Sequence, residues 1–91
     1  MIHLLCRNKL IDFGNWLEVF SSHKKAHVEA GLILKHLWQA SDDPNQIFYL
    51  FRVENAGKAR AFISAPDASE AAQASGVIEG EFHFVASIDG Y

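Results

Sequence analysis

Five histidines carry most of the chemistry that this 91-residue sequence could perform. His23 and His27 stand four residues apart, which places them on the same face of a helix. Such a pair can ligate a metal, but zinc sites need further protein ligands, and Lys24 stands where a metalloprotease motif has its glutamate. We therefore expect no metal. Two roles stay open for the pair, namely catalysis or ligand binding on one hand and hydrogen-bonded structural histidines on the other.

The other three histidines, His3, His36 and His83, fall in three separate strand-like segments. A histidine base in an apolar cavity could remove a phenolic or enolic proton, and the resulting carbanion could react with dioxygen without a cofactor. His23 and His36 are the candidate catalytic residues for such a reaction. The alternative is that the strand histidines are partly exposed or bonded to backbone groups.

Aromatic side chains could line a site for a planar ligand, because they bury a large area while a few polar tips set the orientation. The candidate ligand-binding residues are Trp16, His27, Trp38 and Tyr49. Packing in the core is the alternative for each of them. Arg7 could hold an anionic group of a ligand or form a salt bridge at the rim.

Hydrophobic periodicity and helix caps divide the chain into elements that would position these side chains. Asp12 is placed to cap a helix that ends before Gly31, and Asn55 is placed to cap a second helical region. We expect strands over residues 2–7, 32–39, 47–54 and 81–88, and helices over 12–30, 55–63 and 66–75. We expect residues 41–46 to form a polar connection, which is too long for a two-residue turn.

The order strand, helix, strand, strand, helix, strand predicts an α+β protein with the ferredoxin-like split arrangement. Two right-handed crossovers place both helical regions on one face of a four-stranded antiparallel sheet. No linker or repeat divides the chain, so residues 1–91 form a single domain.

The third strand is apolar on both faces, which a sheet with one solvated face would not show. Alternation sends Tyr49 and Phe51 to one face and Phe48 and Leu50 to the other. Helices cover only one face, and the sequence does not tell which pair lies on the uncovered one. We therefore expect a homodimer in which a second copy covers the bare face, and Phe51→Asp or Tyr49→Asp would break it if these residues lie there.

Composition excludes several partners. The formal net charge is −3 and gives no basic footprint for nucleic acid or an anionic membrane. No apolar run approaches the roughly 20 residues that span a bilayer, and no signal peptide is recognisable. The lone Cys6 lies in an apolar strand and suits a reducing compartment. These features predict a cytoplasmic protein.

Several short motifs resemble a known superfamily. They are Trp16, Phe20 and His23, then Gly31, Asp43-Pro44-Asn45 before an apolar strand, Lys58-Ala59-x-Ala61-Phe62, Ser64-x-x-Asp67 and Ala74-x-Gly76-Val77. Together they are similar to the small dimeric α/β barrel proteins of the antibiotic-biosynthesis-monooxygenase-like superfamily, and most of all to its short cyclase-like members without assigned activity.

The resemblance implies a homodimer with two sheets packed face to face and a ligand cavity either between each sheet and its own helices or within the joined barrel. Members of the superfamily oxidise aromatic substrates without metal or flavin, degrade haem, isomerise lactones or have no known activity. Haem degradation is disfavoured because residues 55–75 contain no histidine to act as the axial iron ligand. We therefore expect no cofactor and two alternatives, a non-catalytic dimeric module that binds a small hydrophobic molecule or a cofactor-independent monooxygenase or isomerase.

Overall fold

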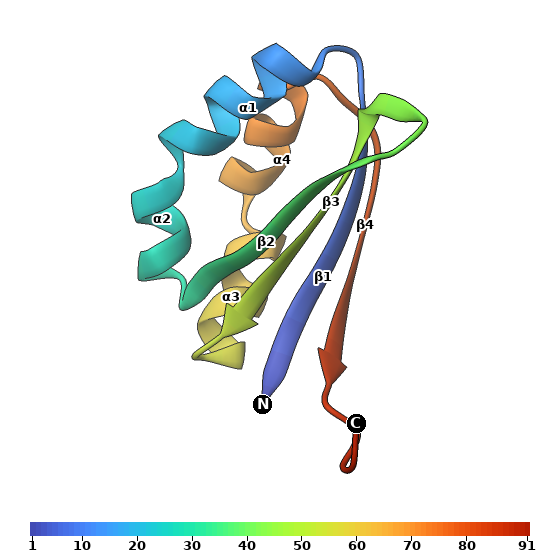
Figure 1. The fold of residues 1–91 in the computed structure, drawn as a ribbon. Helices are drawn as coiled ribbons and strands as arrows, with labels where there is room; N and C mark the ends of the chain where they lie inside the picture. The colour runs from blue at the N-terminus through green and yellow to red at the C-terminus, as the bar shows by residue number, and fades with distance from the viewer.

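The computed structural model describes all residues from Met1 to Tyr91 and contains four strands and four helices. In chain order they are β1 (Ile2–Leu10), α1 (Phe13–Ser22), α2 (Lys24–Glu29), β2 (Leu32–Ala40), β3 (Asp43–Val53), α3 (Ala56–Ser64), α4 (Pro66–Ala74) and β4 (Val77–Ala86). The strands form one antiparallel sheet in the order β2-β3-β1-β4. All helices lie on one face of this sheet (Figure 1). The predicted ferredoxin-like fold is therefore confirmed.

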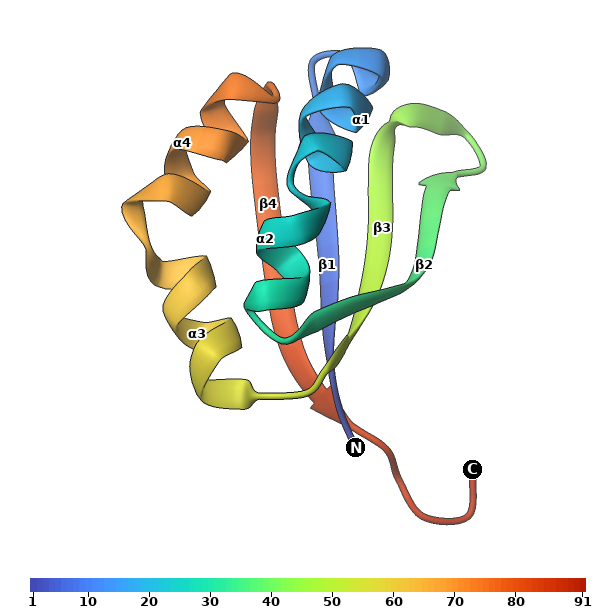
Figure 2. The same ribbon diagram turned by 90° about the vertical axis from the view of Figure 1, so that its left-hand side faces the viewer.

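The helices form two columns that stand side by side over the sheet, α1 with α2 and α3 with α4 (Figure 2). The predicted caps are present, because the Asp12 carboxylate accepts a hydrogen bond from the Asn15 amide at 2.8 Å and Asn55 accepts one from the Lys58 amide at 2.9 Å. Gly31 follows α2 with a φ of 75°, a conformation that favours glycine. None of the helices is long and apolar enough to cross a membrane.

The first helical region is broken at His23, where the sequence predicted one continuous helix. The Val19 carbonyl lies 2.6 Å from the Ser22 hydroxyl and 2.8 Å from Nδ1 of His23. The His23 amide bonds instead to the Phe20 carbonyl. Side chains have thus replaced the backbone donor that would continue the helix, which is a known way in which polar residues compete with helical bonding. α2 then restarts, with the His27 amide bonded to the His23 carbonyl.

The β2–β3 hairpin is tighter than predicted. Ala40 pairs with Asp43, so the turn itself is Ser41 and Asp42, and the expected connection over residues 41–46 is wrong. Pro44 cannot donate to a ladder, and it is tolerated in β3 because it has no ladder partner on either side. The pairing with β1 ends at Gln46, and the pairing with β2 passes from Asp43 directly to Ile47.

The core lies between the sheet and the helices. Ile47 and Phe51 of β3 and Leu4 of β1 are at most 2% exposed and face the helices. Tyr49 alternates with them on the same face. Of the two pairs that the sequence left open, Phe48 and Leu50 therefore lie on the uncovered face.

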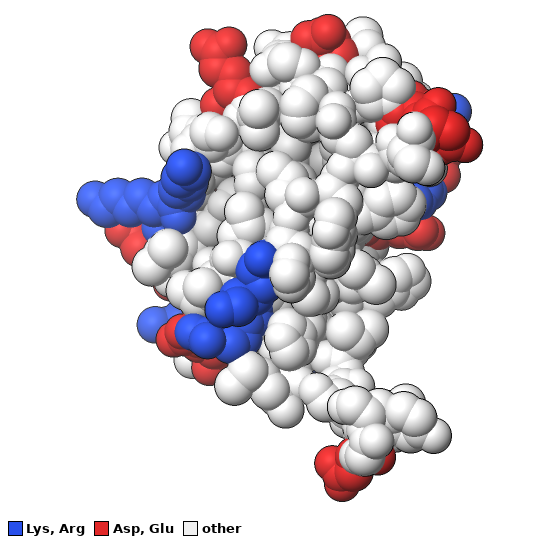
Figure 3. Space-filling view, in the orientation of Figure 1, with Lys and Arg blue, Asp and Glu red and all other residues white.

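The uncovered sheet face exposes large apolar side chains. Leu5 and Val85 are each 37% exposed and Trp38 is 46% exposed. Phe48 and Leu50 are half-buried by their neighbours in the same sheet. Figure 3, in the orientation of Figure 1, shows uncharged atoms through most of the molecule, with basic side chains gathered at the left and lower centre. We call the uncovered surface, with Leu5, Trp38, Phe48, Leu50 and Val85 at its centre, the bare face.

Candidate functional site

A cavity of about 660 Å³ lies between the sheet and the two helical columns. β1 and β3 form its floor, α1 and α2 form one wall, and α3 and α4 form the other. The α4 wall consists largely of small side chains, Ala68, Ala71, Ala72 and Ala74. Alanine is too short to fill the space between a helix and a sheet, so the composition of α4 keeps the cavity open.

Trp16 forms the aromatic wall of the cavity. It is only 2% exposed, and it stacks on Phe20 with ring centroids 4.5 Å apart. Its ring also lies 5.8 Å from that of Tyr49 on the floor. The amphipathic spacing of α1 points Trp16 and Phe20 at the sheet. A planar ligand would meet aromatic rings on two sides here.

Tyr49 supplies the polar tip of the floor. Nδ2 of Asn8 donates a hydrogen bond to its hydroxyl oxygen at 3.1 Å. Cys6 is the register partner of Tyr49 across β1 and β3, and its thiol lies beside the same hydroxyl. Burial raises the pKa of Tyr49, and burial raises the pKa of Cys6 to about 12. Both groups are therefore protonated near neutral pH, and Cys6 is no nucleophile there.

His23 lines the cavity with one ring nitrogen already engaged. Its Nδ1 lies 2.8 Å from the Val19 carbonyl, which can only accept a hydrogen bond. Nδ1 must therefore carry the proton, and in the neutral ring the lone pair is on Nε2. The break between α1 and α2 holds this tautomer in place. His23 is consequently equipped to take up a proton at Nε2.

His27 also lines the cavity, but its surroundings are those of an aromatic core residue. Its ring lies 5.0 Å from Phe20, 5.1 Å from Phe51 and 5.7 Å from Phe62. Burial, with a smaller contribution from the charge of His23, lowers the pKa of His27 to about 4. The ring is therefore neutral at physiological pH and is a weak base. His27 therefore forms part of the cavity wall and is not suited to proton transfer.

His36 and Trp38 lie outside this cavity, on the bare face, although the sequence grouped them with Trp16 and Tyr49. The reason is a bulge at Lys35: Leu34 pairs with Phe51, whereas His36 pairs with Leu50. One extra residue inverts the alternation. Even-numbered side chains of β2 therefore face the helices before the bulge and face away from them after it. On the bare face the two rings stack with centroids 4.8 Å apart.

The strand histidines do not assemble into one site within the chain. A single row across the bare face runs from His36 through Leu50 and Leu5 to His83. His36 and His83 are therefore three strand spacings apart, about 14 Å. No group of three or more histidine, cysteine or acidic side chains is arranged to hold a metal ion.

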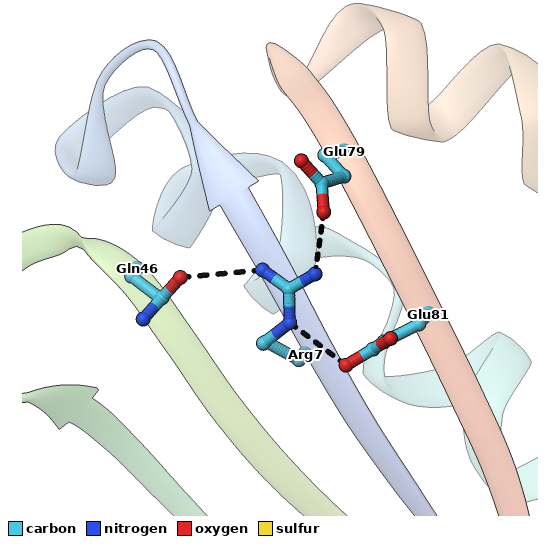
Figure 4. Close-up of polar contacts among 4 residues, drawn as sticks. All are labelled: Arg7, Gln46, Glu79 and Glu81. Atoms are coloured by element: carbon cyan, nitrogen blue, oxygen red, sulfur yellow. Dashed lines mark hydrogen bonds and ion pairs between the residues drawn. The ribbon is translucent and has the colours of Figure 1, made fainter.

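Both strand arginines are engaged in ion pairs outside the cavity. Arg7 binds Glu79 at 2.6 Å and Glu81 at 2.8 Å, and it donates to the Gln46 side chain at 3.2 Å (Figure 4). Arg52 pairs with Glu54 at 2.9 Å. Neither is free to hold a ligand anion in the cavity.

Asn8, Cys6 and the α4 wall are cavity residues that the sequence prediction did not include. A signal for Asn8 was present, because it is the one polar residue in the alternating series Leu4, Cys6, Asn8, Leu10 that faces the helices. The α4 wall had no comparable signal. Its alanines are ordinary helix formers, and only their distance from the sheet makes them cavity residues.

Solved structures of very different sequence share this fold. A candidate antibiotic biosynthesis monooxygenase from Deinococcus radiodurans matches with a TM-score of 0.74 at 10% identity, covering 100% of this chain and 96% of that chain. SnoaB, a cofactor-independent oxygenase from Streptomyces nogalater, matches with a TM-score of 0.77 at 13% identity, covering 97% and 93%. An uncharacterized NIPSNAP domain protein from Burkholderia xenovorans matches with a TM-score of 0.71 at 9% identity, covering 100% and 98%.

No protein-family model and no curated protein sequence matches the chain. The likeness to the solved structures establishes the fold alone, because one fold hosts many activities. At that level the resemblance seen in the sequence is confirmed: the chain has the fold of antibiotic biosynthesis monooxygenases over nearly its whole length.

Proposed function

We propose that the protein is a homodimer that binds a small hydrophobic, aromatic ligand in the cavity between sheet and helices of each chain. The cavity itself is the observation that carries the proposal: 17 of its 23 lining residues are hydrophobic, and its volume of about 660 Å³ suits a small organic molecule. The Asn8 and Tyr49 pair supplies the few polar atoms that would orient such a ligand.

The bare face supports the homodimer. It presents Leu5, Phe48, Leu50 and Val85 without a covering layer, and large continuous apolar surfaces are uncommon on monomers. A second copy would bury the same residues on both sheets. The charged network around Arg7 would then lie toward the rim, where it is satisfied within one chain.

Blocking the cavity tests ligand binding. Ala71 lines the cavity from α4, whereas Ser69 is exposed on the same helix and outside the lining. Ala71→Phe should abolish binding of an uncharged planar fluorophore such as N-phenyl-1-naphthylamine, measured by energy transfer from tryptophan. Ser69→Phe is the matched control and should bind as the wild type does. Equal binding by both variants, with both folded, would place the fluorophore elsewhere and contradict the proposal.

A second candidate function is supported by His23. Because its Nδ1 is bound to the Val19 carbonyl, its Nε2 could remove the phenolic or enolic proton of a ligand in the cavity. The resulting carbanion could react with dioxygen without a cofactor, or reprotonate elsewhere as an isomerase would require. SnoaB, which shares the fold, is a cofactor-independent oxygenase.

Oxygen uptake separates this enzyme from a binding module. With an oxidisable polycyclic phenol as substrate, the enzyme reading predicts consumption of dioxygen that falls about a hundredfold in His23→Gln, while fluorophore binding stays within about twofold. Binding without any oxygen uptake or isomerisation across a panel of phenols and enols would favour the non-catalytic module.

A further inference from the structure

The charges around the cavity have a single sign. Asp67 and Glu70 of α4 are the only formally charged side chains among its lining residues, and no lysine or arginine is present there. The two carboxylates are three residues apart, so they lie on the same side of α4, and both are exposed at the edge of the cavity. A ligand that enters the cavity would therefore pass these two carboxylates and would find no lysine or arginine inside.

The three arginines of the chain are held elsewhere, and none of its five lysines lines the cavity. Arg7 and Arg52 are paired with glutamates on strands outside the cavity. The Arg60 guanidinium lies 4.7 Å from the ring centroid of Phe84, a cation–π contact outside the cavity lining. None of the three can neutralise an anionic group inside.

The remaining groups that might attract an anion do not compensate. His27 is neutral near physiological pH, because burial lowers its pKa to about 4. Nδ1 of His23 is bound to the Val19 carbonyl, so the neutral ring has only an acceptor, Nε2, left for a ligand, and the Asn8 amide donates to Tyr49. The positive end of the α4 dipole is already complemented by Asp67 in its first turn.

From this arrangement we propose that the cavity selects uncharged or cationic aromatic ligands and rejects those that carry a carboxylate, sulfonate or phosphate. The inference rests on the proposed ligand binding and adds the charge class of the ligand. An anionic group would lose its hydration on entry without gaining a cation, which is unfavourable in an apolar site. Glu70 and Asp67 add repulsion at the entrance.

A matched pair of fluorophores tests the selectivity. N-phenyl-1-naphthylamine and 1-anilinonaphthalene-8-sulfonate share the same aromatic skeleton and differ by one sulfonate. In a Trp38→Phe background, where Trp16 is the only donor for energy transfer, the uncharged probe should bind at least about tenfold more tightly than the sulfonate. Only the signal that Ala71→Phe removes is counted as cavity binding.

Charge reversal at the entrance tests the role of the carboxylates. Glu70→Lys should reduce the ratio of the dissociation constant of the sulfonate to that of the uncharged probe by about fivefold or more. Most of this change should come from tighter binding of the sulfonate. Glu18→Lys changes the net charge equally on an exposed α1 residue outside the lining, and it should leave the ratio within about twofold.

The outcomes separate the two proposals. Absence of cavity binding by the uncharged probe would overturn ligand binding itself. Equal binding of both probes would leave ligand binding intact and overturn the selectivity. Equal effects of Glu70→Lys and Glu18→Lys would overturn the role assigned to the entrance carboxylates.

Discussion

His27 shows how the surroundings of a residue decide its chemistry. By spacing it is the partner of His23, and both reach the same cavity. Three phenylalanine rings surround His27, whereas His23 has a carbonyl partner that orients its ring. One histidine is thereby suited to proton transfer and the other to packing, although their residue type is the same.

The lowered pKa of His27 predicts a loss of stability in acid. An unfolded chain binds a proton on this residue as the pH falls through about 6.5, but the folded chain does so only near 4. The free energy of unfolding should therefore be independent of His27 above about pH 7.5 and should decrease as the pH falls from about 6.5 to about 4.

Thermal denaturation of His27→Phe checks this expectation, because phenylalanine fits the aromatic surroundings and does not titrate. Between about pH 7 and about pH 4.5 the melting temperature of the variant should fall less than that of the wild type. A nuclear magnetic resonance titration should give His27 a midpoint near 4. A midpoint near the ordinary value of histidine would contradict the burial argument.

At the scale of elements, the bulge in β2 determines which side chains of that strand lie on which face of the sheet. Leu32 is 2% exposed beneath the helices, while Trp38 is 46% exposed on the bare face. If β2 ran through Lys35 without a bulge, side chains at even positions of the strand would all share one face. The bulge thus allows Leu32 to lie in the core while His36 faces away from the cavity.

Deleting Lys35 should therefore be tolerated nearly as well as truncating its side chain. The deletion removes the bulge and makes Leu34 and His36 consecutive opposite Phe51 and Leu50, so Leu32 stays in the core and His36 stays on the bare face. We expect the free energy of unfolding to change by no more than about 1 kcal/mol. Lys35→Ala keeps the bulge and should change it by no more than about 0.5 kcal/mol. Chemical denaturation measures both, and a fall of more than about 2 kcal/mol for the deletion alone would show that the stability of the sheet depends on the bulge itself.

At the scale of the whole molecule, the sheet is covered on one side only. The helices bury Ile47 and Phe51, so Tyr49 and Phe51 do not lie on the uncovered face, and the condition under which their replacement by aspartate would break a dimer is not met. These substitutions would place a carboxylate in the core of each chain and unfold it. Leu50, on the bare face, is the residue to change.

Leu50→Asp should convert the proposed homodimer into a monomer, raising its dissociation constant by at least about a hundredfold, because each interface would bury an unpaired carboxylate. Size-exclusion chromatography with light scattering measures the mass. Val28→Asp is the control, since Val28 is an exposed apolar residue of α2 in the helical layer. A wild type that is already monomeric at high micromolar concentration would overturn the homodimer, and a dimeric Leu50→Asp would place the interface elsewhere.

The sequence by itself determined the element order, the helix caps and the ferredoxin-like arrangement, because these follow from local patterns: Asp12, Gly31 and Asn55 act on their own neighbours in the chain. It also grouped Trp16, His23, His27 and Tyr49 with His36 and Trp38, and the structure places the first four around one cavity and the other two outside it.

Only the tertiary structure decided which face of each strand is covered. Alternation of side chains is equally consistent with either face, and a single bulge at Lys35 reverses it for His36 and Trp38. The cavity was likewise beyond the sequence, since its volume depends on how far the alanines of α4 stand from the sheet. That distance is set by the packing of the whole chain, which no local pattern encodes.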